Sequence, residues 1–352
     1  MFISGLGTAT PPARYTKADC WTAFEQSDWF QRLDRRSHAI ASSVLTRDNG
    51  IDARRLALES LDDVFAIDPD TLQRRFSTHA PTLAVHAAAK ALADADLGAD
   101  EIDAVVVSTC TGYLCPGLSS YVVERLKLSP SIQAFDLVGQ GCAAALPNLR
   151  LGAALLDAGD SRDVLSICVE VSSAAMFLDN DPGVLVSACL FGDGAGAAVL
   201  SSAPPATKRR IEWKTAESLL EPAQRNALRF EHEGGMLRNV LTRPVPQLAA
   251  SAAQRVLNSV LERTSLSVSD VDAWIMHAGG RDVLMALSER IGMSAHDLRF
   301  SAAMLREYGN MSSAFVYFVL EAALAGDAPP GRWWMSSFGA GFSCHGAMLE
   351  VA

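Results

Sequence analysis

Strand-like and helix-like hydrophobic spacing alternate along the first two hundred residues. β-Branched or apolar runs of strand length predict strands at 102–109, 134–138, 163–170 and 195–200. Apolar residues at helical spacing predict helices at 83–97, 118–128 and 142–158. This alternation is typical of an α/β protein, in which helices cover the faces of a sheet.

The same order of elements starts again in the last third of the chain. Helices are predicted at 248–263, 281–291 and 312–325, with strands at 272–276 and 332–338. The segment 201–210 between the two parts is rich in serine, proline and alanine, which is typical of a surface connection. We therefore predict a structural repeat of two α/β halves, residues 1–203 and 204–352.

Composition and charge narrow the class of protein. Of 352 residues, 49% are hydrophobic and 20% charged, which is typical of a globular protein. The formal net charge of −10 disfavours nucleic acid and anionic lipid as partners. The chain has neither a run of about 18 apolar residues nor the features of a signal peptide. We expect a cytoplasmic protein without a membrane partner.

The cysteines show neither a disulfide pattern nor a metal pattern. There are seven, at irregular spacing, with no CxxC pair and no zinc-type cluster. No metal site is therefore expected. Most cysteines are expected to be small buried residues. Cys142 differs, because Gly139 and Gly141 precede it and a helix of small residues follows. A thiol at a helix N-terminus is favoured as thiolate.

Two further residues share this setting. His277 follows an apolar strand and precedes two glycines, and Asn310 lies between Gly309 and a small-residue helix. Alone, such a histidine is typical of a hydrogen-bonded structural residue, and such an asparagine of a helix N-cap. Together with Cys142, each at a predicted strand-to-helix junction flanked by glycine, they indicate a catalytic set.

Cysteine, histidine and asparagine suit one kind of reaction on thioesters. The thiolate attacks the thioester and holds the acyl group, while the imidazolium keeps the sulfur ionised. The imidazole and the amide then donate hydrogen bonds to the enolate that forms when a malonyl group loses carbon dioxide. A cysteine protease uses the same three residue types, but the repeated strand–helix pattern is not typical of one.

Five segments resemble the type III polyketide synthases, the chalcone and stilbene synthase family: 138–144 (VGQGCAA), 190–195 (LFGDGA), 274–280 (WIMHAGG), 308–313 (YGNMSS) and 337–341 (SFGAG). The resemblance implies a thiolase-like fold, with two duplicated α/β halves packed as a layered αβαβα core. It implies iterative decarboxylative Claisen condensation of malonyl-CoA onto an acyl-CoA starter bound to Cys142. Cyclisation would give a resorcinol, phloroglucinol or pyrone. It further implies a homodimer that uses coenzyme A thioesters as substrates and no cofactor.

The resemblance also assigns residues. It implies Cys142 as nucleophile, His277 and Asn310 as the decarboxylation pair, and Phe191 as a gatekeeper between the coenzyme A tunnel and the cavity. It places five residues on the cavity wall: Cys110, Thr111, Ser172, Ala175 and Ser312. A second gatekeeping phenylalanine has no clear match, and Leu237 and Asn239 lie nearest. The glycine loop contributes Phe338 and Gly339. The basic residues for the coenzyme A phosphates are out of register, and the substitutes are Arg47, Arg54 and Arg55.

Three alternatives remain open. A ketoacyl synthase III uses the same triad, but its histidine motif usually reads HQAN, whereas this chain has HAGG at 277–280. A thiolase would use a second cysteine as base, and the CHG sequence at 344–346 makes Cys344 a candidate. A non-catalytic scaffold of the same fold would not need Cys142.

Overall fold

A mixed sheet organises the protein. The computed structural model describes residues 1–205 and 209–352, and over these residues one sheet of nine strands runs in the order β11-β12-β13-β8-β1-β7-β6-β4-β5. Strands before residue 203 are β1 (Phe2–Ala9), β4 (Ala104–Ser108), β5 (Gln133–Leu137), β6 (Asp163–Glu170) and β7 (Gly194–Ser201). Strands after residue 204 are β8 (Ile211–Leu220), β11 (Ala273–Met276), β12 (Gly331–Gly339) and β13 (Ser343–Val351).

The sheet order keeps the strands of the two predicted halves apart. The five early strands are neighbours, the four later ones are neighbours, and the two sets touch where Phe2 of β1 pairs with Glu212 of β8. Residues 206–208 of the predicted connection lie outside the described residues. The boundary between residues 203 and 204 remains a prediction.

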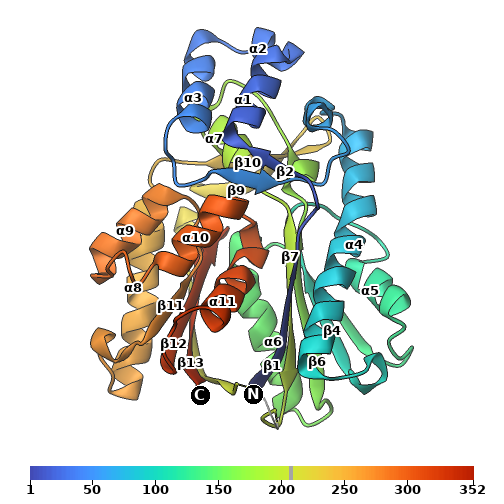
Figure 1. Cartoon of the computed structure of the whole chain (residues 1–352), viewed down its shortest axis with the longest axis vertical. Helices are drawn as coiled ribbons and strands as arrows, with labels where there is room; N and C mark the ends of the chain where they lie inside the picture. The colour runs from blue at the N-terminus through green and yellow to red at the C-terminus, as the bar shows by residue number, and fades with distance from the viewer. Residues whose placement is uncertain (206–208) are drawn as a thin grey trace.

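Helices complete five layers (Figure 1). One outer layer holds α4 (Pro69–Ala95) and α5 (Leu118–Leu126), and the other holds α8 (Val245–Thr264) and α9 (Arg281–Ile291). Between the two sets of strands lie α6 (Ala145–Asp157) and α11 (Phe315–Ala325). The middle helix α11 is apolar on nearly every side because strands flank it on both faces. The predicted αβαβα arrangement is confirmed.

Strands β4 and β6 are covered on both faces, which explains why their apolar residues follow one another without alternating with polar ones. Every residue of β4 is buried, as are seven of the eight residues of β6. Glycine and alanine set the distance between α4 and β1, because a Cβ at Gly5 would lie 2.2 Å from the Ala91 carbonyl oxygen. Among the described residues, no helix combines the length and apolar character needed to cross a bilayer.

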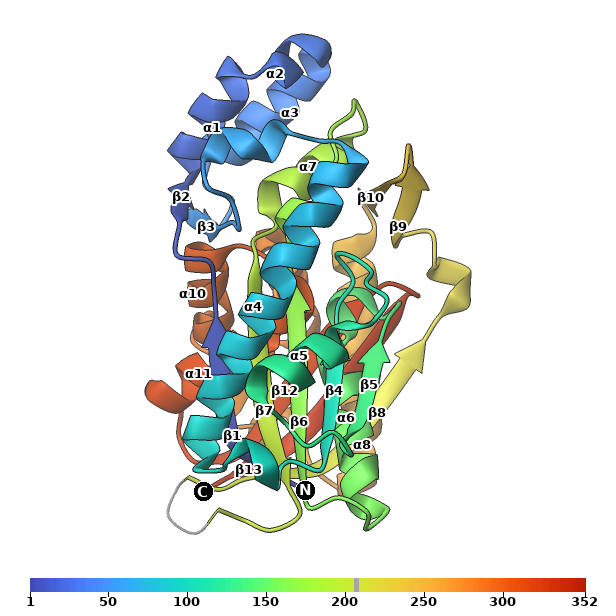
Figure 2. The same ribbon diagram turned by 90° about the vertical axis from the view of Figure 1, so that its right-hand side faces the viewer.

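A cap lies over one end of the layers (Figures 1 and 2). Its helices are α1 (Lys17–Gln26), α2 (Asp28–Arg32), α3 (Arg35–Thr46) and α7 (Pro182–Leu190). Its strands form two small sheets, β2 (Arg14–Thr16) with β3 (Ala53–Arg55), and β9 (Leu228–Glu233) with β10 (Met236–Leu241). The sequence pattern did not predict these elements.

The structure corrects the setting of one candidate residue. Asn310 follows a helix, α10 (Arg299–Tyr308), and precedes the single 3₁₀ turn Ser312–Ala314 that leads into α11. The predicted strand-to-helix junction is therefore wrong for Asn310. It is right for Cys142, which follows β5, and for His277, which follows β11.

Candidate active site

Two glycines bring the Cys142 turn against β12. Cys142 lies in the 3₁₀ turn Gly141–Ala143, just before α6, and is 8% exposed. Gly141 has φ +55°, a conformation that favours glycine. A Cβ at Gly339 would lie 2.5 Å from the Ala143 nitrogen, so glycine is required on the β12 side as well. The two segments therefore meet closely enough to enclose the sulfur.

Hydrogen bonds join Cys142 to the other two candidates. Ser312 Oγ lies 3.2 Å from Cys142 Sγ, and the Ser312 N–H donates to Asn310 Oδ1 at 2.8 Å. Asn310 Nδ2 donates to the Gly279 carbonyl at 3.2 Å, two residues after His277. Ser312 has φ +50°, which is uncommon for a non-glycine residue and is found most often at functional sites. The three predicted loops therefore meet in one place.

His277 is buried without a polar partner for its ring. It is 1% exposed, and the rings of Phe315 and Phe338 contact it edge-on, at centroid distances of 5.5 and 5.0 Å. Neither Nδ1 nor Nε2 has a hydrogen-bond partner among the described residues. Buried polar atoms are nearly always paired, so an unpaired imidazole is a candidate for function. Burial lowers its pKa to about 3.

Burial also determines the state of the thiol. It raises the pKa of Cys142 to about 12, against the smaller opposing effect of the Ser312 hydrogen bond. Both shifts favour a neutral thiol and a neutral imidazole in the free protein. The resident thiolate–imidazolium pair expected from the sequence remains a prediction, which these shifts oppose. The loss of hydration on burial outweighs the favourable position before α6.

A pocket with a cavity volume of about 40 Å³ lies at the sulfur. It is lined by Cys142 and by seven of the other predicted residues: Cys110, Thr111, Ser172, Ala175, Phe191, Asn239 and Ser312. Leu237 instead lines a larger groove that adjoins the pocket. Further lining residues that sequence reasoning missed include Met176, Phe177, Val184, Leu228, Arg229 and Phe230. Alternate side chains of a strand face the same side, so recognising β9 as a strand would have placed Leu228 and Phe230 on one face.

Glu170 is the most informative residue that the sequence reasoning did not single out. It is fully buried at the end of β6, and it accepts hydrogen bonds from Thr111 Oγ1 at 2.9 Å and the Cys110 N–H at 3.1 Å. Ser312 Oγ lies 3.3 Å from Glu170 Oε1, so Glu170 and Cys142 compete for one hydroxyl proton. Burial raises the pKa of Glu170. The sequence feature that could have indicated Glu170 is the presence of a glutamate at the end of an apolar strand.

Comparison with known proteins identifies the family. The profile described as FAE1/Type III polyketide synthase-like protein matches residues 12–220, and the profile for the C-terminal domain of chalcone and stilbene synthases matches residues 214–332. This chain belongs to the type III polyketide synthases. It is accordingly an enzyme of the acyltransferase class, as predicted, and neither alternative reaction class finds support.

Individual relatives of the synthase agree. The alpha-pyrone synthesis polyketide synthase-like Pks18 of Mycobacterium tuberculosis is 31% identical, over 91% of this chain and 82% of the relative. The 3,5-dihydroxyphenylacetyl-CoA synthase of Streptomyces toyocaensis is 28% identical, over 99% and 89%. The crystal structure of PKS-I from the brown alga Ectocarpus siliculosus superposes with a TM-score of 0.90 at 25% identity, covering 99% and 98%.

The arginine assignments need correction. Arg54 is 6% exposed, and its guanidinium donates to the carbonyls of Ala188 at 2.7 Å and Phe191 at 3.0 Å, so it is not available to a phosphate. Arg55 is held by an ion pair with Glu307 at 3.3 Å and by the Pro12 carbonyl at 3.0 Å. A sequence does not reveal that an arginine is buried. Arg47 is exposed at the end of α3, and its role remains a prediction.

Three other candidate residues lie outside the pocket lining. Phe338 contacts the His277 ring, and Gly339 lets β12 approach the Cys142 turn. Cys344 is fully buried in β13 and does not line the pocket at Cys142. Within residues 1–205 and 209–352, no group of three or more His, Cys, Asp or Glu side chains is placed to hold a metal ion.

Stability should fall on acidification because of His277. Its pKa is about 3 in the folded synthase and about 6.5 unfolded, so the unfolded chain binds the extra proton below pH 6.5. Going from about pH 7 to about pH 5, this group should cost about 2 kcal/mol of the free energy of unfolding. Urea unfolding at the two pH values measures this loss.

His277→Gln should lose about 2 kcal/mol less than wild type on acidification, whereas a variant of the exposed His296, His296→Gln, should behave as wild type. Equal losses in all three proteins would contradict the burial argument.

Proposed function

We propose that the synthase loads an acyl-CoA starter onto Cys142 and extends it with malonyl-CoA by decarboxylative Claisen condensation. The observation that carries the proposal is the buried His277 with two unpaired ring nitrogens, whose loop is linked at Gly279 through Asn310 and Ser312 to a cysteine that lines a pocket. A structural histidine would have found partners.

Loading begins from the neutral thiol. As Cys142 Sγ attacks the thioester carbonyl, its proton must leave, and an unpaired nitrogen of neutral His277 is the acceptor. The carbon–sulfur bond to coenzyme A breaks, and the proton passes to the departing thiolate. The acyl group has then moved from coenzyme A to Cys142, and the thiol proton has moved from Cys142 to coenzyme A. This exchange needs no cofactor.

Extension needs hydrogen-bond donors. The malonyl carboxylate leaves as carbon dioxide, and the electron pair moves into an enolate whose oxygen takes hydrogen bonds from His277 N–H and Asn310 Nδ2–H. Asn310 Nδ2 has two hydrogens, and its bond to Gly279 uses one. The enolate carbon attacks the acyl group on Cys142. A new carbon–carbon bond forms as the bond between the acyl carbon and Cys142 Sγ breaks. The released thiolate takes a proton from water, and the lengthened chain leaves on coenzyme A.

Cyclisation and assembly extend the proposal. The names of two relatives, an alpha-pyrone synthesis protein and a 3,5-dihydroxyphenylacetyl-CoA synthase, support ring closure to a pyrone or a resorcinol, and phloroglucinol remains the third predicted product. A homodimer is supported by exposed Tyr113 (69%) and Val138 (59%) at the adjoining groove. A monomeric mass by light scattering would contradict it. The cytoplasmic location remains a prediction of the sequence.

The direct test supplies radiolabelled malonyl-CoA with a panel of acyl-CoA starters. We expect products extended by two or more malonyl units and released as aromatic or pyrone rings, identified by mass spectrometry. A single acetoacetyl product would favour a ketoacyl synthase or a thiolase. A protein that forms no acyl adduct with any thioester would be a scaffold.

A further inference from the structure

Asn239 carries an unused hydrogen-bond acceptor into the catalytic pocket. It lies on β10, is 8% exposed, and lines the pocket together with Cys142. Its Oδ1 is buried and has no hydrogen-bond partner among the described residues. Ser172 Oγ is the second such atom on the pocket wall. Leaving a buried acceptor unpaired is costly, so these atoms are suited to a ligand.

Two other polar groups on this wall are already engaged. Thr111 Oγ1 donates to Glu170, and Ser312 Oγ lies between Cys142 and Glu170. These groups belong to the network around the reacting sulfur. Asn239 lies outside that network, so its amide oxygen is free to take part in recognition of the acyl chain.

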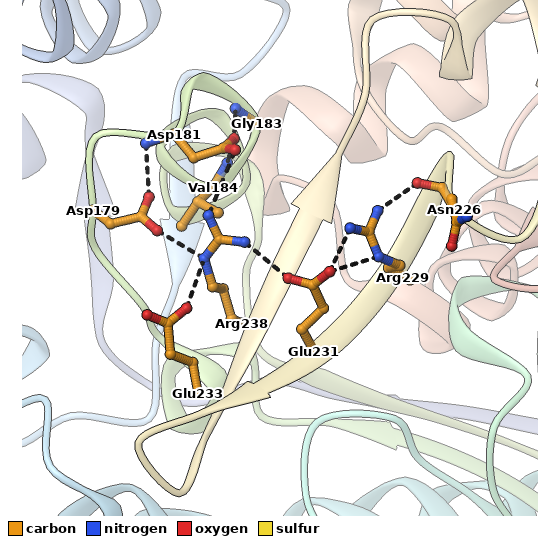
Figure 3. Close-up of polar contacts among 9 residues, drawn as sticks. All are labelled: Asp179, Asp181, Gly183, Val184, Asn226, Arg229, Glu231, Glu233 and Arg238. Carbon is orange, nitrogen blue, oxygen red and sulfur yellow. Dashed lines mark hydrogen bonds and ion pairs between the residues drawn. The ribbon is translucent and has the colours of Figure 1, made fainter.

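The neighbouring residue fixes the direction of Asn239. In the β9–β10 hairpin, Asn239 stands opposite Phe230, which also lines the pocket. Arg238 must therefore point to the opposite face. There its guanidinium meets four carboxylates (Figure 3). The distances to them are 2.7 Å for Asp179, 3.0 Å for Glu231, 3.4 Å for Glu233 and 3.5 Å for Asp181.

These contacts join two walls of the pocket. Asp181 accepts hydrogen bonds from the N–H groups of Gly183 at 2.8 Å and Val184 at 3.3 Å, and so caps α7. Val184 of α7 also lines the pocket. Because Arg238 binds the α7 cap and the hairpin together, β10 has little freedom to rotate, and Asn239 stays turned inward.

We propose that Asn239 is a specificity residue whose Oδ1 accepts a hydrogen bond from a hydroxyl group of the acyl chain, and that Arg238 is the positioning residue for it. The inference rests on the proposed function. An amide oxygen accepts but does not donate, so the ligand group must be a donor. An acyl chain without a hydroxyl would bury Oδ1 unpaired. Sites of this kind reject the analogue that lacks the donor.

Matched thioesters test the specificity. Cys142→Ala protein, which should not react, is titrated by calorimetry with hexanoyl-CoA against 6-hydroxyhexanoyl-CoA, and with 3-phenylpropionyl-CoA against its 4-hydroxyphenyl analogue. We expect the hydroxylated member of at least one pair to bind roughly tenfold to a hundredfold more tightly. Adding Asn239→Leu should reduce that ratio to about one. Adding Asn258→Leu, on the exposed side of α8, should leave it unchanged.

Three results would overturn the assignment. One is equal binding within both pairs. Another is a hydroxyl preference that survives Asn239→Leu. The third is an equal loss for both members of a pair, which would place Oδ1 on the pantetheine arm that they share. If Asn239→Leu does not fold, Asn239→Ala removes the same acceptor.

The positioning role has its own readout. Arg238→Met should lower the hydroxyl preference, and Arg238→Lys should restore part of it, because lysine keeps the charge but not the planar fork. A merely structural arginine would change both affinities together and leave the ratio intact. Wild-type enzyme that makes no polyketide from any starter would refute the proposed function, whereas turnover without a hydroxyl preference would refute the Asn239 assignment alone.

Discussion

Replacing Cys142 with alanine is expected to lower polyketide formation by at least about 10³-fold, because the variant lacks the sulfur proposed to hold the acyl chain. This sulfur lines the pocket and is joined by Ser312 to the Asn310 loop. Radiolabelled malonyl-CoA with an accepted starter measures product formation. Intact-mass spectrometry of the same samples should show the acyl adduct on wild type and none on Cys142→Ala.

The control is another buried cysteine. Cys344 is as deeply buried but lies in β13, away from the pocket lining. Cys344→Ala should stay within about twofold of wild-type activity at temperatures where it is folded. Normal turnover by Cys142→Ala would refute the nucleophile assignment, and an inactive but folded Cys344→Ala would revive the thiolase reading.

Exchanging Asn310 for aspartate should lower decarboxylation of malonyl-CoA by about 10²- to 10³-fold, which is the effect of removing one oxyanion donor. The carboxylate keeps the acceptor for the Ser312 N–H but removes the amide hydrogens of Nδ2. Release of labelled carbon dioxide measures this step. Acylation of Cys142 by the starter, followed by intact mass, should change much less.

The matched control makes the same substitution, asparagine to aspartate, at a surface position, Asn258. It is exposed on α8, and Asn258→Asp should leave both steps unchanged. If Asn310→Asp lost acylation and decarboxylation equally, the amide would hold the loop rather than the enolate. Wild-type decarboxylation in Asn310→Asp would refute its role as donor.

The sequence predicted the elements that are buried on both faces. The continuous apolar runs of β4 and β6 have few alternatives, and α9 was predicted with its observed bounds, Arg281–Ile291. The cap helices α1–α3 were missed because their apolar residues pack against a small local cluster rather than the main core.

The residues that form the site could be predicted from the sequence, but the pKa shifts of their side chains could not. Cys142 and the seven lining residues gather as expected. The flanking glycines indicated Cys142, whereas the seven lining residues came from the resemblance to the family. The pKa of Cys142 depends on how completely the halves bury it, which is a tertiary property. The assignment of Arg54 failed for the same reason, since its carbonyl partners, Ala188 and Phe191, lie 134 and 137 residues away in the sequence.

Arg54 has a consequence for redesign of the enzyme. The carbonyl that it holds on Phe191 belongs to the same short segment whose neighbours, Leu190 and Gly192, hydrogen-bond the Asn310 backbone at 2.9 and 3.0 Å. Phe191, the expected gatekeeper, and Asn310, the proposed amide donor, are therefore connected through their backbones and held from the cap by Arg54. A change that moves the Phe191 backbone is expected to impair decarboxylation as well, so a chimera that exchanges this segment should carry Arg54 and the Asn310 loop with it.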